Sequence, residues 1–289
     1  MLIEFLGVYK NMEITTNKQL ILKFYTTGEN KNIEELCIND FDNFYQKYEV
    51  GNIIVSLLNS YNDIIQILDK YIRKIDKSTP LTLAELTKVF KNLIKNLETK
   101  KFYIISKLLE INFNKLCYRI ENIEKYDLLV DKEYNKFQGN ILGTPEIYIR
   151  RRGFPNYAFK NFLLRFKRSF SNTKNIVEKN FNIDNNRDTN IPLKYELPKM
   201  FVEYIDNNLS YTYYITSITD LLLASTYNLH LSKKFILKCE YCGNLFVPKT
   251  NKKEQKYCYK KDDYDEYICR NKGRKNIWYR NKNQNNKSN

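Results

Sequence analysis

The spacing of apolar residues predicts helices over most of the first 130 residues. Apolar side chains recur every three or four positions over residues 33–45, 53–72 and 102–129. This spacing places them on one face of an α-helix. Residues 1–30 are ambiguous, because the stretch ILKFYTT fits a strand as well as the end of a helix.

A helix start is predicted at Thr82, directly after the turn-forming sequence STPL. Glu85 follows three residues later, at the beginning of an apolar-periodic stretch that runs to Glu98. At this spacing the Thr side chain can accept a bond from the Glu backbone, and the Glu side chain can accept one from the Thr backbone. The pair therefore predicts a capping box.

The pattern changes between residues 131 and 160. Three glycines and two prolines in FQGNILGTPEIYIRRRGFPNYAF predict a loop with at most one short strand. A basic helix is expected from Lys160, followed by a polar linker and by helices over 197–205 and 211–229. The sequence KKFILK is expected to lead, as a strand, into Cys239.

Four cysteines in the C-terminal region have the spacing of a metal site. Cys239 and Cys242 form a CxxC pair, Cys258 follows after 15 intervening residues, and Cys269 follows after ten more. Gly243 after the pair indicates a turn that leads into an extended run, whereas a redox CxxC starts a helix at its second cysteine. Four thiolates are the ligand set of a structural Zn²⁺ site, which has no open position for catalysis.

Two other arrangements of these residues remain open. In one, only the CxxC pair matters and the two later cysteines are ordinary thiols. In the other, His230, the single histidine, replaces one of the cysteines. Cys37 and Cys117 are expected on apolar helical faces as core residues.

These patterns predict a mainly α fold in two parts. Residues 1–232 form a mainly helical domain of unknown role, with a break in the range 131–160. Residues 233–282 form a small zinc finger of treble-clef or ribbon type with a basic C-terminal helix, and residues 283–289 form a disordered tail. A segment this short does not build its own apolar core, so a metal is expected to stabilise it.

The net charge of +15 is concentrated in two short regions. Residues 233–289 hold 16 Lys and Arg against 6 Asp and Glu, and residues 145–174 hold 8 against 1. A surface this basic attracts polyanions, either nucleic acid or an anionic membrane. No run of 18 apolar residues exists and the apolar start lacks the basic segment of a secretory signal, so we expect a cytoplasmic protein.

The C-terminal finger resembles the bacterial CGNR-type zinc finger. It resembles more closely the C-terminal finger of an uncharacterised bacterial protein family. The matching positions are Cys239, Cys242, Gly243, Phe246, Pro248, Lys256, Tyr257, Cys258, Cys269, Arg270 and Gly273. The long spacing between the last two cysteines departs from the CGNR pattern, as does Arg-Asn in place of Gly-Asn-Arg. The resemblance covers only about residues 235–282 and implies a zinc site in a DNA-binding regulator.

Basic residues of the two charged regions are candidates for phosphate contacts, because each Lys or Arg near a phosphate releases counterions. Trp278 is expected to pack against Phe246 rather than to stack on bases, and the acidic loop 262–266 is expected to be solvated. The predicted nucleic-acid-binding residues are Lys249, Lys252, Lys253, Arg270, Arg274, Lys275 and Arg280, with Arg150, Arg151 and Arg152 as a second patch.

These features predict a bacterial or phage protein that binds Zn²⁺ and nucleic acid, with DNA as the expected partner. The expected role is that of a transcriptional regulator or mobile-element accessory factor, with a homodimer through the helical region left open. One alternative is a protein–protein adaptor whose finger is purely structural. Another is a metal-dependent enzyme acting on nucleic acid, which one histidine and the absence of common catalytic motifs disfavour.

Overall fold

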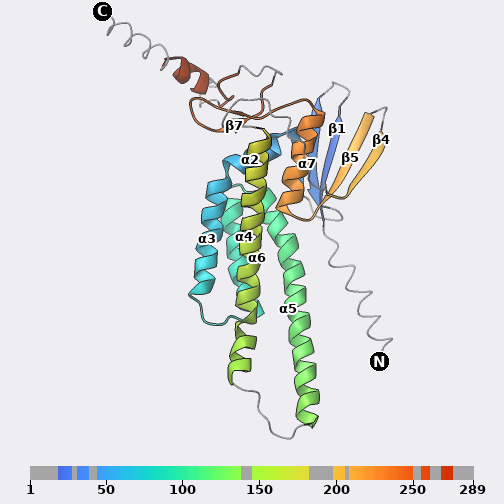
Figure 1. Ribbon diagram of the computed structural model, residues 1–289, viewed down its shortest axis with the longest axis vertical. Helices are drawn as coiled ribbons and strands as arrows, with labels where there is room; N and C mark the ends of the chain where they lie inside the picture. The colour runs from blue at the N-terminus through green and yellow to red at the C-terminus, as the bar shows by residue number, and fades with distance from the viewer. Residues whose placement is uncertain are drawn as a thin grey trace, which may run out of the picture.

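The molecule combines an antiparallel sheet with a group of long helices (Figure 1). The structure is a computed structural model. Side chains are described for all of the described residues except 122–154 and 205–208. The described residues are 19–27, 31–38, 44–137, 145–181, 198–205, 208–249, 255–260 and 268–275.

The sheet has five strands in the order β3-β2-β1-β5-β4, and each neighbouring pair is antiparallel. The strands are β1 (Leu20–Thr26), β2 (Asn32–Ile38), β3 (Tyr45–Glu49), β4 (Met200–Ile205) and β5 (Asn208–Ile215). The middle strand, β1, pairs with β2 on one side and with β5, from much later in the sequence, on the other. Leu20 therefore lies opposite both Ile38 and Ile215. The ambiguous stretch ILKFYTT is therefore a strand.

The expectation of a mainly α fold is wrong, because segments expected to be helical are strands β2, β3, β4 and β5. In β2 the inward positions are Glu34, Leu36 and Ile38, all buried. A glutamate at an inward position interrupts the alternation of apolar and polar residues that marks a strand. The apolar residues Ile33, Leu36 and Cys37 are then spaced as on one face of a helix. Cys37 lies on this strand and is half-buried, not on a helical face as expected.

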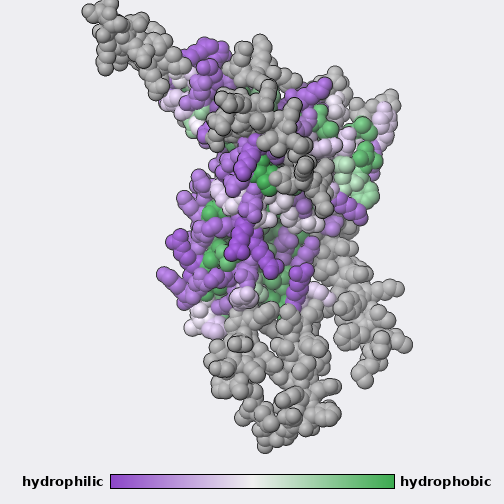
Figure 2. Space-filling model, in the orientation of Figure 1, coloured by the Kyte–Doolittle hydropathy of each residue, from purple (hydrophilic) through white to green (hydrophobic). Residues whose placement is uncertain are grey.

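Strand β4 was mistaken for a helix for a different reason. It is one of the two edge strands of the sheet. Phe201, Val202 and Tyr204 are all exposed although they alternate between the two faces of the sheet. The hydrophobic surface over β4 and β5 is visible at the upper right of Figure 2. With both faces exposed, the sequence carries no alternation that indicates a strand.

The predicted helices at 53–72, 82–98 and 102–129 are confirmed. Thr82 caps its helix as expected, with Glu85 completing the capping box. The helices are α2 (Asn52–Asn59), α3 (Tyr61–Asp76), α4 (Leu83–Thr99), α5 (Tyr103–Phe137), α6 (Pro145–Asn180) and α7 (Ile218–Leu231). Helices α3 to α6 form a bundle, and α7 lies against the sheet (Figure 1).

Helix α5 ends at Phe137 and helix α6 begins at Pro145, so the loop expected over 131–160 is wrong for residues 131–137 and 145–160. Pro155 lies inside this helix and is buried. The next residue, Asn156, accepts a bond from the backbone N–H of Leu81 and donates to the carbonyl of Thr79. These bonds to the connection between α3 and α4 stabilise the helix beside Pro155, a residue that by itself disfavours a helix interior.

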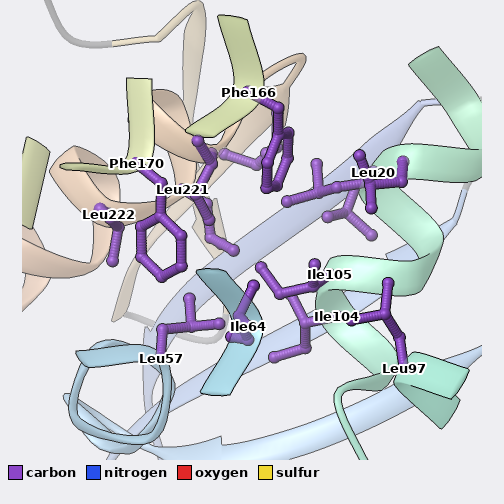
Figure 3. Packing of buried hydrophobic residues seen from close by; sticks show 14 of the residues in the cluster. Leu20, Leu57, Ile64, Leu97, Ile104, Ile105, Phe166, Phe170, Leu221 and Leu222 are labelled. Atoms are coloured by element: carbon purple, nitrogen blue, oxygen red, sulfur yellow. The ribbon is translucent and has the colours of Figure 1, made fainter. Parts of the chain in front are cut away.

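One apolar core joins the sheet to the helices (Figure 3). Leu20 of β1 faces helix residues such as Ile64, Ile105 and Leu221, all of them buried. Phe170 of α6 packs edge-on against Tyr61 at the start of α3, with 5.0 Å between ring centres. The core extends to Leu245 in the C-terminal segment, which is therefore packed against the rest of the molecule.

Candidate metal centre

The CxxC pair lies in the turn between the short strands β6 (Leu237–Lys238) and β7 (Leu245–Phe246). The N–H of Cys239 donates to the carbonyl of Asn244, and the N–H of Gly243 donates to the carbonyl of Cys239, both at 2.9 Å. Gly243 has a φ of +73°, which glycine adopts without strain. The turn predicted after the pair and the strand predicted before it are confirmed.

The two later cysteines lie in separate described segments. Cys258 lies in the irregular segment 255–260, and its N–H points at the sulfur of Cys239 at 3.4 Å. Cys269 lies in the first turn of a helix over residues 268–275. The N–H of Ile268 donates to the carbonyl of Lys260 at 3.0 Å. This bond brings the segments that carry Cys258 and Cys269 together despite the long spacing between them.

The four sulfur atoms all lie within 4.8 Å of one another. The sulfur of Cys258 is 3.7 Å from that of Cys242 and 3.4 Å from that of Cys269. A tetrahedral site with metal–sulfur bonds of about 2.3 Å requires sulfur–sulfur distances of about 3.8 Å. Disulfide bonding requires about 2.05 Å, so these are free thiols at the separation that suits a metal ion.

Backbone groups of the turn favour the thiolate form of one ligand. Burial alone raises the pKa of the Cys239 thiol, but N–H groups of Cys242, Cys258 and Tyr241 point at its sulfur and bring the pKa down to about 7. Burial raises the pKa of Cys258 and Cys269. The site is thus built around one readily ionised thiol, and a bound cation would favour ionisation of the others.

The core beside the cysteines is small and aromatic. Phe246 packs edge-on against Tyr259, with 6.1 Å between ring centres. Gly273 presses on Tyr257, since a Cβ at that position would come within 2.3 Å of the tyrosine ring. The predicted packing of Trp278 against Phe246 stays a prediction, because Trp278 lies outside the described residues.

The cysteine segment is anchored to helix α2. The side-chain amide of Asn59 donates to the carbonyl of Leu245 at 2.9 Å and accepts from its N–H at 2.8 Å. This amide therefore pairs with β7 as a neighbouring strand would. At the other end of α2, Gly51 lies against Leu229 of α7 and Val247. Sequence reasoning missed Asn59 and Gly51, because an Asn at a helix end and a Gly before one are too common to single out.

Gly51 also connects this anchor to a buried carboxylate. Its N–H donates to Glu34 at 3.2 Å, and the side chain of Asn228 donates to the other carboxylate oxygen at 2.9 Å. Tyr213 in turn donates to the Asn228 side chain at 2.8 Å. Burial raises the pKa of Glu34 to about 7, more than these hydrogen bonds lower it, and no charged group contributes to the shift.

Glu34 should make the protein less stable as the pH rises. Its pKa is about 7 when folded and about 4.5 when unfolded, so stability is lost from about pH 4.5 upward until pH exceeds 7. Between about pH 5 and pH 8 we expect the wild type to lose on the order of 2 kcal/mol relative to Glu34→Gln. Urea unfolding of both proteins at both pH values measures this difference.

Loss of metal at low pH affects both proteins and cancels in this comparison. The Gln side chain keeps two hydrogen bonds if the Asn228 amide turns over, so the variant should fold. An unfolding free-energy difference that is the same at both pH values would show that Glu34 does not titrate in this range.

The structure brings together part of the predicted nucleic-acid surface. Arg270, Arg274 and Lys275 are exposed on the 268–275 helix, and Lys249 is exposed with its ammonium group over the Tyr259 ring. The remaining predicted residues, Lys252, Lys253, Arg280, Arg150, Arg151 and Arg152, lie where the structure describes no side chains. The phosphate contacts of all these residues stay predictions.

Comparisons with protein-family models, with curated proteins and with solved structures find no match to this chain. The interpretation therefore depends on the site itself. In the described part of the chain, no helix combines the length and the apolar composition that crossing a membrane requires. His230, the alternative ligand, stacks on Phe181 at 5.2 Å and is not part of the cysteine group.

Proposed function

We propose that this chain holds one Zn²⁺ at Cys239, Cys242, Cys258 and Cys269 and binds nucleic acid, DNA in the first instance. The observation that carries the proposal is the position of the 268–275 helix. It supplies the fourth cysteine from a buried position and carries four cations at exposed positions.

The ligand set supports zinc over other metals. Four thiolates in a tetrahedral arrangement suit Zn²⁺ or iron, whereas Mg²⁺ and Ca²⁺ require oxygen ligands. All four sulfurs are needed to complete a tetrahedron, so the site has no open position for a reacting group. The metal therefore has a structural role in this proposal.

The outer side of the helix suits a phosphate backbone. Arg270, Lys272, Arg274 and Lys275 are exposed, and the segment 268–275 contains no acidic residue. None of the four forms an ion pair with a carboxylate in the part of the chain that the structure describes. The close approach of Gly273 to Tyr257 holds this helix with its glycine side inward. Exposed cations without carboxylate partners suit sequence-independent phosphate contacts.

The basic residues of α6 provide a contrast. Lys160 pairs with Asp76, Lys167 with Asp69, and Lys174 with Glu178. The first two pairs tie α6 to α3, so these charges are neutralised within the fold. Part of the positive charge of the region 145–174 is therefore not available to attract a polyanion. For this reason we place the nucleic-acid contact at the C-terminal helix.

Fluorescence anisotropy with a labelled DNA duplex tests the proposal. The variant Arg270→Gln/Arg274→Gln/Lys275→Gln should bind at least ten-fold more weakly at about 50 mM salt. Its slope of log affinity against log salt should be shallower by about 3 units, because three phosphate contacts are lost. Zinc content and the circular dichroism spectrum should be unchanged, since these side chains are exposed.

The variant Lys160→Gln/Lys167→Gln/Lys174→Gln is the matched control, with the same change in net charge. It should retain nearly all of the DNA affinity, because those lysines are already paired. Equal losses in the two triple variants would contradict the proposal, since they would indicate only a general attraction of opposite charges. Absence of DNA binding by the wild type at low salt would favour the adaptor, with the finger serving only to cap α2 through Asn59.

A further inference from the structure

A cleft of about 440 Å³ lies between helices α5 and α6 and the start of α7, away from the metal centre. Its volume is in the range of small-molecule binding sites, about 300–1,000 Å³. Part of its lining is apolar and aromatic, with Leu116 from α5 and Tyr157, Phe162 and Phe166 from α6. Tyr157 is 66% exposed, so most of its ring is available for contact.

The charged residues that line the cleft are cationic. They are Lys115 and Arg119 of α5 and Arg165 of α6, and no Asp or Glu of the described residues lines it. None of the three is paired with a carboxylate among the described residues. The neighbouring lysines of α6 that face α3 are paired, so the fold neutralises one side of α6 and leaves charge on the side facing the cleft.

The start of α7 does not supply the attraction for an anion. Asp220 already accepts bonds from the N–H groups of Thr216 and Ser217, at 2.9 and 2.8 Å. The Ser217 side chain caps the N–H of Asp220 in return. The helix end therefore has its own internal anion, and the three cations of α5 and α6 remain the groups that can bind one.

We propose that this cleft binds a nucleoside monophosphate. The phosphate lies among Lys115, Arg119 and Arg165, which satisfy its two negative charges with charge-assisted hydrogen bonds. The base lies against Tyr157 and Phe162, whose rings suit a flat heterocycle. Asn161 and Ser169 also line the cleft and provide polar groups for the sugar. This site is separate from the proposed zinc and DNA functions and does not depend on them.

Saturation-transfer NMR and calorimetry on the full chain test this proposal, with AMP, GMP, CMP and UMP as probes. At least one should bind with a Kd below about 1 mM, and inorganic phosphate or the bare nucleoside should bind more weakly. Arg165→Gln should weaken binding about ten-fold or more, and Tyr157→Ala several-fold. Both side chains are exposed, so the variants should fold.

Lys160→Gln is the control, since it removes the same charge from the same helix but on the side paired with Asp76. It should leave nucleotide binding unchanged. The proposal is overturned if none of the four nucleotides binds at about 5 mM, or if Arg165→Gln and Lys160→Gln weaken binding equally. It is also overturned if Arg165→Gln lowers DNA affinity while no nucleotide binds, because the cleft would then belong to a nucleic-acid surface.

Discussion

Replacing Cys269 by Ser is expected to release the bound zinc and unfold the C-terminal segment around the cysteines. The hydrophobic cluster around the metal centre consists of Cys239, Phe246, Cys258 and Cys269, so three of its four buried members are ligands themselves. With so few apolar side chains, the metal supplies most of the folding energy, for which structural zinc sites provide about 10–16 kcal/mol.

Mass spectrometry of purified protein measures this effect directly. The wild type should contain about one zinc per chain and Cys269→Ser less than about a tenth of that. NMR amide signals of residues 237–275 should collapse to unfolded positions, while those of the sheet and bundle stay dispersed. The sheet and helices have their own large core, so they should survive.

Cys117→Ser is the control for this experiment. Cys117 is half-buried on α5, packed against the main core and far from the cysteine group in the sequence. Its variant should keep the full zinc content. A wild type without zinc, or a Cys269→Ser variant that retains it, would overturn the four-cysteine site.

Replacing Gly51 by Ala is expected to lower the free energy of unfolding by about 3 kcal/mol or more. Gly51 has a φ of +85°, which costs an L-residue about 1–2 kcal/mol. The added Cβ would also lie 2.5 Å from Leu229 and 2.8 Å from Val247. Relieving both clashes requires the Leu229 and Val247 side chains, or the elements that carry them, to shift, and overpacking of this kind costs a further 1–3 kcal/mol or so.

The variant Gly243→Ala separates the cost of the positive φ from the cost of the steric clash. Gly243 also has a positive φ, of +73°, but a Cβ there meets nothing within 4 Å. This variant should lose only the backbone contribution, about 1–2 kcal/mol, as measured by chemical unfolding of the zinc-bound protein. Equal losses in the two variants would show that the packing of Gly51 against α7 and Val247 contributes nothing.

The metal centre could be predicted from the sequence because its signal is local. One CxxC pair, two further cysteines, a turn glycine and a strand before Cys239 all lie within one segment of about 30 residues. The capping box at Thr82 is local over a still shorter range. In both cases the side-chain chemistry that carries the signal lies close together in the sequence.

The sheet could not be predicted because its stabilising contacts are distant. Glu34 can be buried in strand β2 because the side chain of Asn228, almost 200 residues later, donates a hydrogen bond to its carboxylate. Helix α6 continues past Pro155 because Asn156 bonds the connection between α3 and α4. The anchor of the metal centre on Asn59 is likewise a contact between segments remote in sequence.

The position of β1 in the middle of the sheet has a consequence for biosynthesis. One edge of β1 pairs with β2, which is made immediately afterwards, but the other edge pairs with β5, near the end of the chain. While the ribosome makes all the helices from α2 to α6, that edge of β1 has no partner and can pair with other nascent chains. Translation that stops before residue 215 should therefore yield an aggregation-prone chain that depends on chaperones.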